Sequence, residues 1–366
     1  MSKAVDFNQA PWVVIWEVTQ ACGLACVHCR ASAQPRRDPR ELSMEEGKQL
    51  LREVHELGSP VLVFTGGDPL ERPDIPDLVR YAREIGLAPA LTPSATPRLT
   101  EAAVSSLADA GLARLALSLD GATAATHDRF RGVSGSFAQT LAAVGWARSL
   151  GLEVQINTTV AHSNLHELEA IADLLDPWGI STWSVFFLVP TGRANAAEML
   201  NAEESEAAFE RLYAVARRNR FPVRTTEALH YRRYLLQRKR EGAPQTAPNP
   251  WAPRSLPRGI SDGSGFVFVS HVGNVYPSGF LPVSAGNVRT EPLAKIYRDS
   301  PLFRALRDHD SLHGKCGVCE YRHVCGGSRA RAYALTGDWL AADPTCIYEP
   351  VRAQAEAMAA EKMGTV

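Results

Sequence analysis

Short apolar segments alternate with amphipathic segments along the N-terminal two thirds of the chain. Each apolar segment is a few residues long, and most are rich in β-branched or aromatic residues, as expected of parallel strands buried on both faces. Several of the intervening segments repeat apolar residues at the spacing of one helical face. The predicted strands are Val13–Val18, Val61–Phe64, Ala88–Leu91, Ala113–Leu119, Glu153–Thr159 and Thr182–Leu188.

Two of the amphipathic segments carry clear end signals. Ser43 followed by Glu46 has the spacing of a capping box, and the apolar face of the helix that follows ends at Gly58. A second helix is predicted after Asn164 and stops near Pro177. Strand–helix units in series predict an α/β fold, a partial (β/α)6 barrel of the TIM type with too few units for a complete eightfold barrel.

The chain changes character after this series. Residues 236–265 are rich in proline and poor in aliphatic residues, so we expect a loop or linker. A hairpin is predicted over Phe266–His271 and Asn274–Tyr276. The predicted domains are an N-terminal lead over 1–11, the barrel over 12–235, the linker, and a small domain over 266–366 with a C-terminal helix.

Composition excludes several classes of protein. Lys and Arg total 39 against 40 Asp and Glu, a net charge of -1, so there is no basic surface for nucleic acid or for an anionic membrane. No apolar run approaches the roughly 18 residues of a membrane-spanning helix. The N-terminus lacks the apolar stretch of a signal peptide. We therefore expect a cytoplasmic protein with neither nucleic acid nor membrane as a partner.

The seven cysteines fall into two groups. The first group, Cys22, Cys26 and Cys29, has the spacing C-x3-C-x2-C directly after the first predicted strand. Three thiolates on one loop can hold three irons of a 4Fe–4S cube and leave the fourth iron open to a small molecule. Barrel enzymes place their chemistry at this end of the strands. Zinc is the alternative, although zinc sites usually take four protein ligands.

This motif, together with the segment after the second strand, resembles the radical S-adenosylmethionine (SAM) enzymes. Gly66, Gly67, Asp68 and Pro69 match the family's Gly-Gly-Glu-Pro segment, with Asp in place of Glu. In the family, the backbone of that segment lies against the amino group of SAM, and two glycines suit a close backbone approach to a ligand. The resemblance covers residues 12–235 and implies a 4Fe–4S cluster that binds SAM.

The resemblance also implies further contacts to SAM. Ser118 and Asp120 fall where family members contact the ribose, and Asn157 on the fifth strand is expected to contact the same ligand. Arg193, after the sixth strand, is expected to pair with the methionine carboxylate. His28 takes a position where relatives often carry an aromatic residue beside the adenine. The alternatives are ordinary strand-end polarity and, for His28, a surface position.

The second cysteine group, near the C-terminus, has the spacing C-x2-C-x5-C and a distant fourth cysteine. Four thiolates can close an iron–sulfur cluster completely, and a zinc ribbon is the alternative. The pattern resembles the family's SPASM or twitch extensions, which carry auxiliary clusters. A full two-cluster module has cysteines where this chain has Ser278 and Arg329, so we expect one auxiliary 4Fe–4S cluster. Its expected ligands are Cys316, Cys319, Cys325 and Cys346.

The resemblance implies that the reduced first cluster cleaves SAM to methionine and a 5′-deoxyadenosyl radical, which takes a hydrogen atom from the substrate. Residues 316–346 look most like enzymes that trim propionate side chains of tetrapyrroles in heme-type biosynthesis, and residues 286–289 add to the likeness. We expect a tetrapyrrole or another small molecule as substrate, and a flavodoxin or ferredoxin as reductant. The basic stretch over 232–240 could receive substrate carboxylates or be a solvated helix end.

Other functions stay open at this point. One is maturation of a ribosomally synthesised peptide, and another is oxidation or epimerisation of a small sugar-like metabolite. A protein without catalytic activity that binds zinc at two sites is the alternative from a different class. The sequence does not choose a proton donor or radical partner among His127, His162, His230, His271 and Tyr276.

Overall fold

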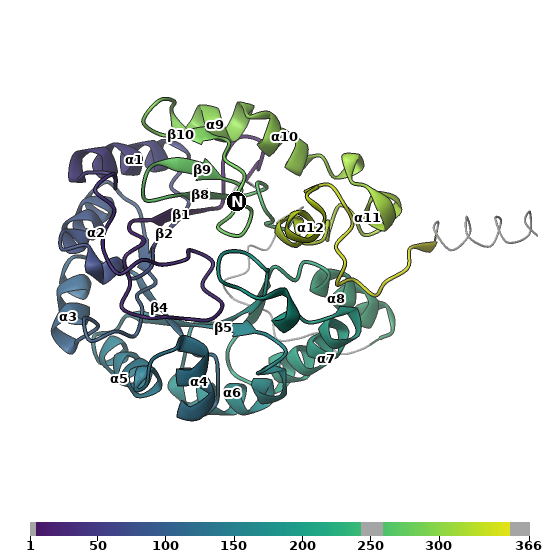
Figure 1. Cartoon of the computed structure of the whole chain (residues 1–366), viewed down its shortest axis with the longest axis horizontal. Coiled ribbons are helices and arrows are strands. Elements are labelled where there is room, and N and C mark those ends of the chain that lie inside the picture. The colour runs from purple at the N-terminus through teal and green to yellow at the C-terminus, as the bar shows by residue number, and fades with distance from the viewer. Residues whose placement is uncertain (1–4, 243–258, 352–366) are drawn as a thin grey trace, which may run out of the picture.

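The computed structural model describes residues 5–242 and 259–351. Its parallel strands follow one another in chain order across a single sheet, each paired with the next (Figure 1). All six predicted strands form, which confirms the α/β partial barrel. The strands are β1 (Val13–Glu17), β2 (Val61–Thr65), β3 (Pro89–Leu91), β4 (Arg114–Ser118), β5 (Glu153–Val160), β6 (Thr182–Phe187) and β7 (Val223–Thr226).

Helices follow the strands and cover the outside of the sheet as a ring (Figure 1). The capping box of Ser43 and Glu46 forms as predicted at the start of α1. The helix after Asn164 also forms, with short 3₁₀ turns at both ends, the second of them at Pro177. The helices are α1 (Met44–Glu56), α2 (Ile75–Glu84), α3 (Glu101–Asp109), α4 (Ala124–Arg131), α5 (Ser136–Ser149), α6 (Leu168–Leu175), α7 (Ala202–Arg218) and α8 (Tyr231–Arg240).

The sheet is larger than the six strands that the sequence predicts. β7 was missed because it has four residues, all half-buried, and includes an arginine and two threonines rather than an apolar run. The predicted hairpin forms as β8 (Phe266–Val269) and β9 (Asn274–Tyr276), but β8 pairs in parallel with β1. The first strand of the C-terminal region therefore extends the barrel sheet, and the short strand β10 (Gly286–Asn287) ends it.

The C-terminal region closes the ring between α1 and α8 (Figure 1). The expected domain boundaries stay a prediction, although α8 continues to Arg240, beyond the barrel end expected at 235. Part of the expected linker and the expected C-terminal helix over 352–366 lie outside the described residues. The remaining helices are α9 (Leu293–Asp299), α10 (Pro301–Arg307), α11 (Gly314–Val318) and α12 (Arg329–Thr336).

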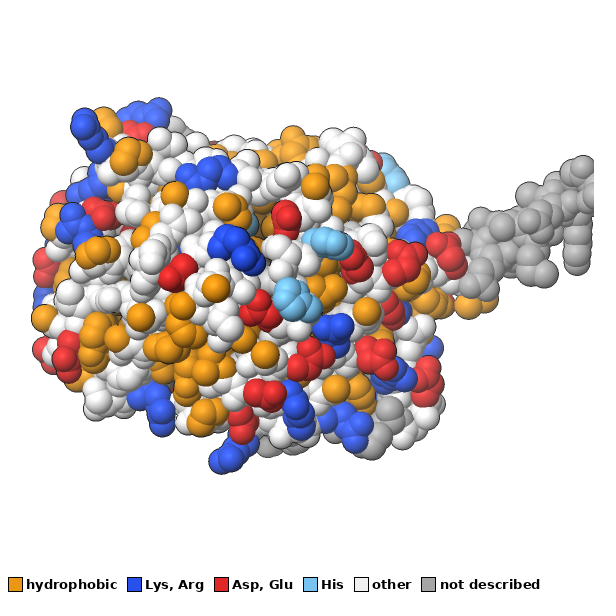
Figure 2. Space-filling model, turned by 60° about the horizontal axis from the view of Figure 1, so that its bottom comes forward, with side chains coloured by type: hydrophobic (Ala, Val, Ile, Leu, Met, Phe, Trp, Pro, Cys, Tyr) orange, Lys and Arg blue, Asp and Glu red, His pale blue; other side chains and the backbone are white. Residues whose placement is uncertain are grey.

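The core lies between the sheet and the surrounding helices. Trp16, Phe64 and Trp183 are fully buried there, and Trp183 satisfies its indole N–H by donating to Thr158 Oγ1 at 2.8 Å. Acidic and basic side chains are interspersed on the face shown in Figure 2, in keeping with the near-zero net charge. Within the described residues, no helix is both long enough and apolar enough to cross a membrane.

Candidate active site and auxiliary cysteine site

The first cysteine group lies on the loop after β1, and a hydrogen-bond donor lies beside each sulfur atom. Burial raises the pKa values of the Cys22 and Cys26 thiols, so a bound metal must displace their protons to form thiolates. Hydrogen bonds to sulfur stabilise cluster thiolates, so this environment fits an iron–sulfur cluster. The contacts are Leu24 N to Cys22 Sγ at 3.3 Å, Ala33 N to Cys29 Sγ at 3.5 Å, and Arg131 Nη1 to Cys26 Sγ at 3.9 Å.

Gly66 and Gly67 pass directly against the backbone of the cysteine loop. Gly67 N donates to Thr19 O at 2.9 Å, and Asp68 N donates to Ala21 O at 2.7 Å. A Cβ on Gly67 would lie 2.4 Å from Ala21 O, and one on Gly66 would lie 2.6 Å from Thr19 O. The glycines are therefore required by the approach of one backbone to another. Their expected contact with SAM stays a prediction.

Asp68 holds the surrounding segments together. It is fully buried, and its Oδ1 accepts a backbone N–H of the 3₁₀ helix η1 (Pro69–Glu71) at 3.1 Å. Its Oδ2 accepts from Thr96 Oγ1 at 2.7 Å, and burial raises the pKa of its carboxyl group. Thr96 lies on the segment that follows β3, and this segment also places Ser94 Oγ 3.5 Å from Cys22 Sγ. Asp68 thus helps to position the segment that places Ser94 beside Cys22. Asp68 also caps the 3₁₀ helix η1, which begins at Pro69.

Asp120 is committed to a buried ion pair. Its Oδ2 lies 2.5 Å from Arg131 Nη2, and its Oδ1 accepts from Thr159 N at 2.7 Å. Burial alone would raise the pKa of Asp120, but the charge of Arg131 and the hydrogen bond from Thr159 N oppose it, and the pKa lies below its usual value. Arg131 also reaches Cys26, so Asp120 orients a cation beside the first cysteine group. The expected ribose contact stays a prediction.

Three other predicted SAM contacts lie on neighbouring elements. The His28 ring packs 4.3 Å from the ring of Phe130, and burial lowers the pKa of His28 to about 3. Its Nδ1 makes no hydrogen bond within the described residues. Ser118 and Asn157 are register partners on β4 and β5, both half-buried, and Asn157 Oδ1 accepts from Gln155 Nε2 at 2.8 Å. These positions fit the expected role of each residue without testing it.

Arg193, on the segment after β6, binds the cysteine loop that follows β1. Its backbone N–H donates to Cys29 O at 3.0 Å, and its Nε donates to Cys26 O at 3.1 Å. Gly192 has a φ of 67°, and a Cβ there would lie 2.3 Å from Arg30 O. Arg193 therefore fixes the loop through carbonyl groups. A pairing with the methionine carboxylate stays a prediction.

A buried polar cluster at the ends of β1 and β8 was not predicted. Glu17 is 2 % exposed, and its carboxylate lies 3.1 Å from Arg30 Nη1 and 2.9 Å from His271 Nδ1. The Arg30 guanidinium lies 4.5 Å from the centre of the Phe268 ring. The cluster joins the residue after Cys29 to the C-terminal hairpin. The parallel pairing of β8 with β1 brings these residues together, and no local sequence pattern predicts that pairing.

All four C-terminal cysteines line one pocket. Cys319 Sγ accepts from Tyr321 N at 3.4 Å, and Cys325 Sγ accepts from Gly327 N at 3.3 Å. Burial raises the pKa of the Cys325 thiol to about 12 and that of Cys346 to about 11, so these thiols also need a metal to ionise them. The pocket is lined by Cys316, Cys319, Cys325, Cys346, His230, Arg233, Lys315, Tyr321, Arg322, Gly326, Gly327, Tyr348 and Pro350.

All seven cysteines are free thiols. In the described part of the chain, no three His, Cys, Asp or Glu side chains converge closely enough to bind a single metal ion. A single zinc ion draws its ligands to within about 2.3 Å of one point, whereas a 4Fe–4S cube carries its thiolates on separate iron atoms.

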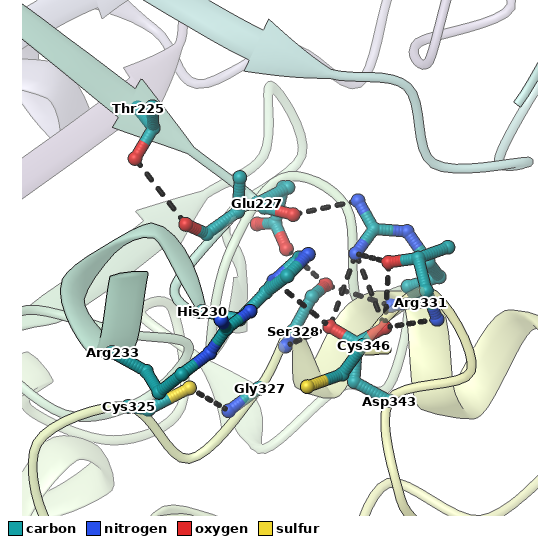
Figure 3. Close-up of polar contacts among 12 residues, drawn as sticks. Thr225, Glu227, His230, Arg233, Cys325, Gly327, Ser328, Arg331, Asp343 and Cys346 are labelled. Atoms are coloured by element: carbon teal, nitrogen blue, oxygen red, sulfur yellow. Dashed lines mark hydrogen bonds and ion pairs between the residues drawn. The ribbon is translucent and has the colours of Figure 1, made fainter. Parts of the chain in front are cut away.

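A buried carboxylate braces the two segments that carry Cys325 and Cys346 (Figure 3). Asp343 accepts from Ser328 N at 2.8 Å and from Thr345 N at 3.1 Å, which joins the residues that flank the two cysteines. Arg331 Nη1 lies 3.1 Å from Asp343 Oδ2. Burial opposes ionisation of Asp343, but Arg331 outweighs it and holds the pKa of Asp343 well below its usual range. Sequence reasoning missed this brace.

The brace continues into the barrel. Arg331 Nη2 donates to Glu227 O at 2.6 Å, and Ser328 Oγ donates to the Glu227 carboxyl group. Burial raises the pKa of Glu227 well above its usual range. Burial also lowers the pKa of His230, which begins α8, to about 4. The end of β7 and the start of α8 thus form the barrel side of the second cysteine site.

The two positions that lack a cysteine are filled by structural residues. Ser278 is buried and its Oγ accepts from Phe280 N at 3.2 Å. Arg329 is 2 % exposed, and its Nη1 donates to Ala341 O at 2.6 Å and to Trp339 O at 3.1 Å. Neither side chain offers a metal ligand with the properties of a thiolate. This fits one auxiliary cluster.

The basic stretch of α8 has a buried start and an exposed end. Arg233 is buried and Arg232 is half-buried, and both make internal contacts, so they do not form a free surface for substrate carboxylates. Lys239 and Arg240 are exposed, which fits the alternative of a solvated helix end. The contacts are Arg232 Nη2 to Ile260 O at 2.5 Å, Arg233 Nη2 to Glu206 Oε2 at 2.6 Å, Arg238 Nε to Tyr234 Oη at 3.0 Å, and Arg240 Nη1 to Tyr321 Oη at 2.9 Å.

Comparison with known proteins gives the class. Residues 16–175 match the profile of the radical SAM superfamily, and residues 261–320 match an iron–sulfur cluster-binding domain of the SPASM type. The chain belongs to the radical SAM superfamily. It is a radical SAM enzyme whose cofactors are SAM and 4Fe–4S clusters, one of them auxiliary.

Particular relatives refine this class. The chain is 40% identical over 346 residues to the AdoMet-dependent heme synthase of Methanosarcina barkeri, covering 94% of this chain and 99% of the relative. It is 41% identical over 342 residues to the protein of the same name from Nitratidesulfovibrio vulgaris, covering 93% of each. The crystal structure of Streptococcus suis SuiB bound to S-adenosylmethionine matches with a TM-score of 0.72 at 16% identity, over 93% of this chain and 78% of that one, a likeness of fold alone.

Proposed function

We propose that the chain removes propionate side-chain carboxylates from a tetrapyrrole in the formation of a heme-type product. The observation that carries the proposal is 40–41% identity to heme synthases over nearly the whole chain. Cys22, Cys26 and Cys29 would hold the cluster that binds SAM, and Cys316, Cys319, Cys325 and Cys346 would hold the auxiliary cluster. When bound, SAM supplies a 5′-deoxyadenosyl radical that takes a hydrogen atom from the substrate.

The electron balance explains why this reaction suits two cysteine sites. A propionate side chain that loses a hydrogen atom next to its –CH2–COO⁻ group can release carbon dioxide and form a carbon–carbon double bond. One electron is then left over and must be accepted. A site closed by four cysteines is suited to electron transfer. The alternatives of peptide maturation and sugar oxidation have no specific feature of the described residues in their favour.

The residues around the first cysteine site position the cysteine loop and do not take part in the reaction themselves. Arg193 and the glycines fix the cysteine loop, and Arg131 supplies positive charge beside Cys26 while Asp120 holds it in place. Buried groups of this kind exclude water from a site in which a radical must survive. We assign Glu17, Arg30 and His271 to the wall of the substrate site, because they join the loop of Cys29 to the C-terminal hairpin.

The proposal includes the partners and the location. We propose a flavodoxin or ferredoxin as the reductant, because the first cluster must receive an electron before SAM is cleaved. We propose the cytoplasm as the location. Free cysteines are usual in reducing compartments, and all seven are free here.

The test is anaerobic turnover with Fe-coproporphyrin III, dithionite and SAM, followed by mass spectrometry of the tetrapyrrole. The proposal predicts the loss of one carbon dioxide and two hydrogen atoms for each trimmed side chain, with one 5′-deoxyadenosine formed for each loss. The control is the same tetrapyrrole with its propionates esterified, which cannot lose carbon dioxide. Formation of 5′-deoxyadenosine with an unchanged tetrapyrrole would contradict the substrate and leave the enzyme class intact.

A further inference from the structure

His230 lies at the boundary between the barrel core and the second cysteine site. It is fully buried and lines the same pocket as the four C-terminal cysteines. The edge of its ring packs against Phe209 of α7, with the ring centres 4.7 Å apart. In Figure 3 it lies between Glu227 and the sulfur atoms of Cys325 and Cys346. The contact with Phe209 therefore fixes the His230 ring on one side, and the other side of the ring borders the cysteine pocket.

Neither ring nitrogen of His230 makes a hydrogen bond of ordinary geometry with the described residues, although the backbone carbonyl of Thr345 lies near enough to interact weakly with the ring. The Asp343 carboxylate is 3.9 Å from Nδ1, too far for a hydrogen bond. An imidazole carries at least one N–H in every protonation state that occurs in proteins. Buried donors nearly always have a well-placed acceptor, so an N–H that lacks one at this position points to a partner inside the pocket.

The surroundings of the ring favour an acceptor that carries negative charge. Arg233 lines the same pocket, and its Nε also has no hydrogen-bond partner, while its terminal nitrogens bind Glu206. The other buried arginine nearby, Arg331, already binds Asp343 and Glu227 O through its terminal nitrogens, so these are not counted among the donors without a partner. Two buried donors, one on a cation, thus border a pocket with four thiols. The sulfur atoms of an iron–sulfur cluster accept such hydrogen bonds.

We propose that His230 is a positioning residue that donates a hydrogen bond to a sulfur atom of the auxiliary cluster and so raises the reduction potential of that cluster. The inference rests on the proposed assignment of Cys316, Cys319, Cys325 and Cys346 as its ligands. Reduction adds negative charge to the cluster, and a donor aimed at sulfur stabilises the reduced form. His230 would thereby make the cluster a better acceptor of the electron left by the substrate.

The experiment isolates the auxiliary cluster. The full chain carrying Cys22→Ala, Cys26→Ala and Cys29→Ala is reconstituted anaerobically, its iron is counted, and its reduction potential is measured by a redox titration followed by EPR. The same measurement is made with His230→Phe added, which keeps the ring packing and removes both nitrogens. His230→Gln and His230→Asn each restore an N–H donor, and the two side chains differ in length by one methylene group. Tyr348→Phe is the matched control, because Tyr348 lines the pocket while its hydroxyl donates to Glu320.

We expect the His230→Phe cluster to have a lower potential than its parent, with about four irons kept per chain. We expect at least one of the two amide variants to return the potential toward the parent value, and Tyr348→Phe to leave it unchanged. An unchanged potential in His230→Phe, or a loss in His230→Phe that neither amide variant recovers, would overturn the inference. A parent chain that holds no iron would instead contradict the ligand assignment on which it rests.

Discussion

The two cysteine sites are held in place by different means. The N-terminal loop is fixed through its own backbone, which packs against glycines at Gly66, Gly67 and Gly192 and binds Arg193 through carbonyl oxygens. The C-terminal site is fixed by buried charged side chains, with Asp343 and Arg331 joining segments that are distant in sequence. Three ligands within one short loop need only a rigid surface beneath them. A fourth ligand far along the chain needs a brace.

The difference bears on function. The N-terminal site offers three thiols, which leaves one iron of a cube available to a small molecule, whereas the C-terminal site offers four thiols in one lined pocket. An open cluster suits chemistry on a bound ligand, and a closed one suits electron transfer. A change confined to one site should therefore leave the other site as an internal reference.

Removal of a cysteine ligand should abolish the function of its own site and leave the cluster of the other site in place. We expect Cys26→Ala to abolish formation of 5′-deoxyadenosine and to reduce iron from about eight to about four per chain, because one thiolate of the open cluster is lost. Cys325→Ala is the matched variant in the other site, and we expect SAM cleavage to survive in it while trimming of the tetrapyrrole falls. Cleavage retained in Cys26→Ala would contradict the assignment of the first site.

A backbone change should affect only the first site. In Gly67→Ala the added Cβ would lie 2.4 Å from Ala21 O, so the cysteine loop must move. We expect loss of at least ten-fold in SAM cleavage, with the iron of the C-terminal site retained. Gly145→Ala is the control, because Gly145 lies within α5 and its Cβ would have nothing within 4 Å. Equal activity of the two variants would show that the close approach is unimportant.

A change in the brace should affect only the second site. Asp343→Asn leaves the buried Arg331 without its carboxylate, and breaking a buried ion pair typically costs about 3–5 kcal/mol. We expect a lower free energy of unfolding and loss of iron from the C-terminal site, measured by iron content and thermal unfolding. SAM cleavage should remain. Glu46→Gln breaks an exposed pair with Arg289 and should change stability by only about 0–1 kcal/mol.

The smallest expected effect is on the pH dependence of stability. Burial lowers the pKa of His127 to about 4, and its Nδ1 accepts from Asp120 N at 3.0 Å, so the folded state holds it neutral. In the unfolded chain it binds a proton below about pH 6.5, which favours unfolding. Stability should therefore be unaffected above that pH and fall between about pH 6.5 and pH 4. We expect His127→Gln to show a shallower fall, and an equally steep fall would contradict this role.

The sequence predicted what is local and missed what depends on long-range pairing. The six predicted strands, the capping box at Ser43 and the C-x3-C-x2-C loop could be recognised because each is encoded within a few consecutive residues, and the C-x2-C-x5-C run marked the second cysteine group even though its fourth cysteine is distant. Asp68 and Arg193 lie beside the cysteine loop, and their bonds to other parts of the protein could not be foreseen from the sequence. The clusters around Glu17 and Asp343 were missed because each joins residues that lie far apart in the sequence.

The central claim is that the cysteines divide into one open and one closed cluster site. The most direct test is anaerobic reconstitution of the full chain, with iron and sulfide counted and 5′-deoxyadenosine measured in the presence of dithionite and SAM. We predict about eight irons per chain and formation of 5′-deoxyadenosine that depends on the reductant. About four irons with continued turnover would contradict the auxiliary cluster, and colourless, inactive protein would contradict both.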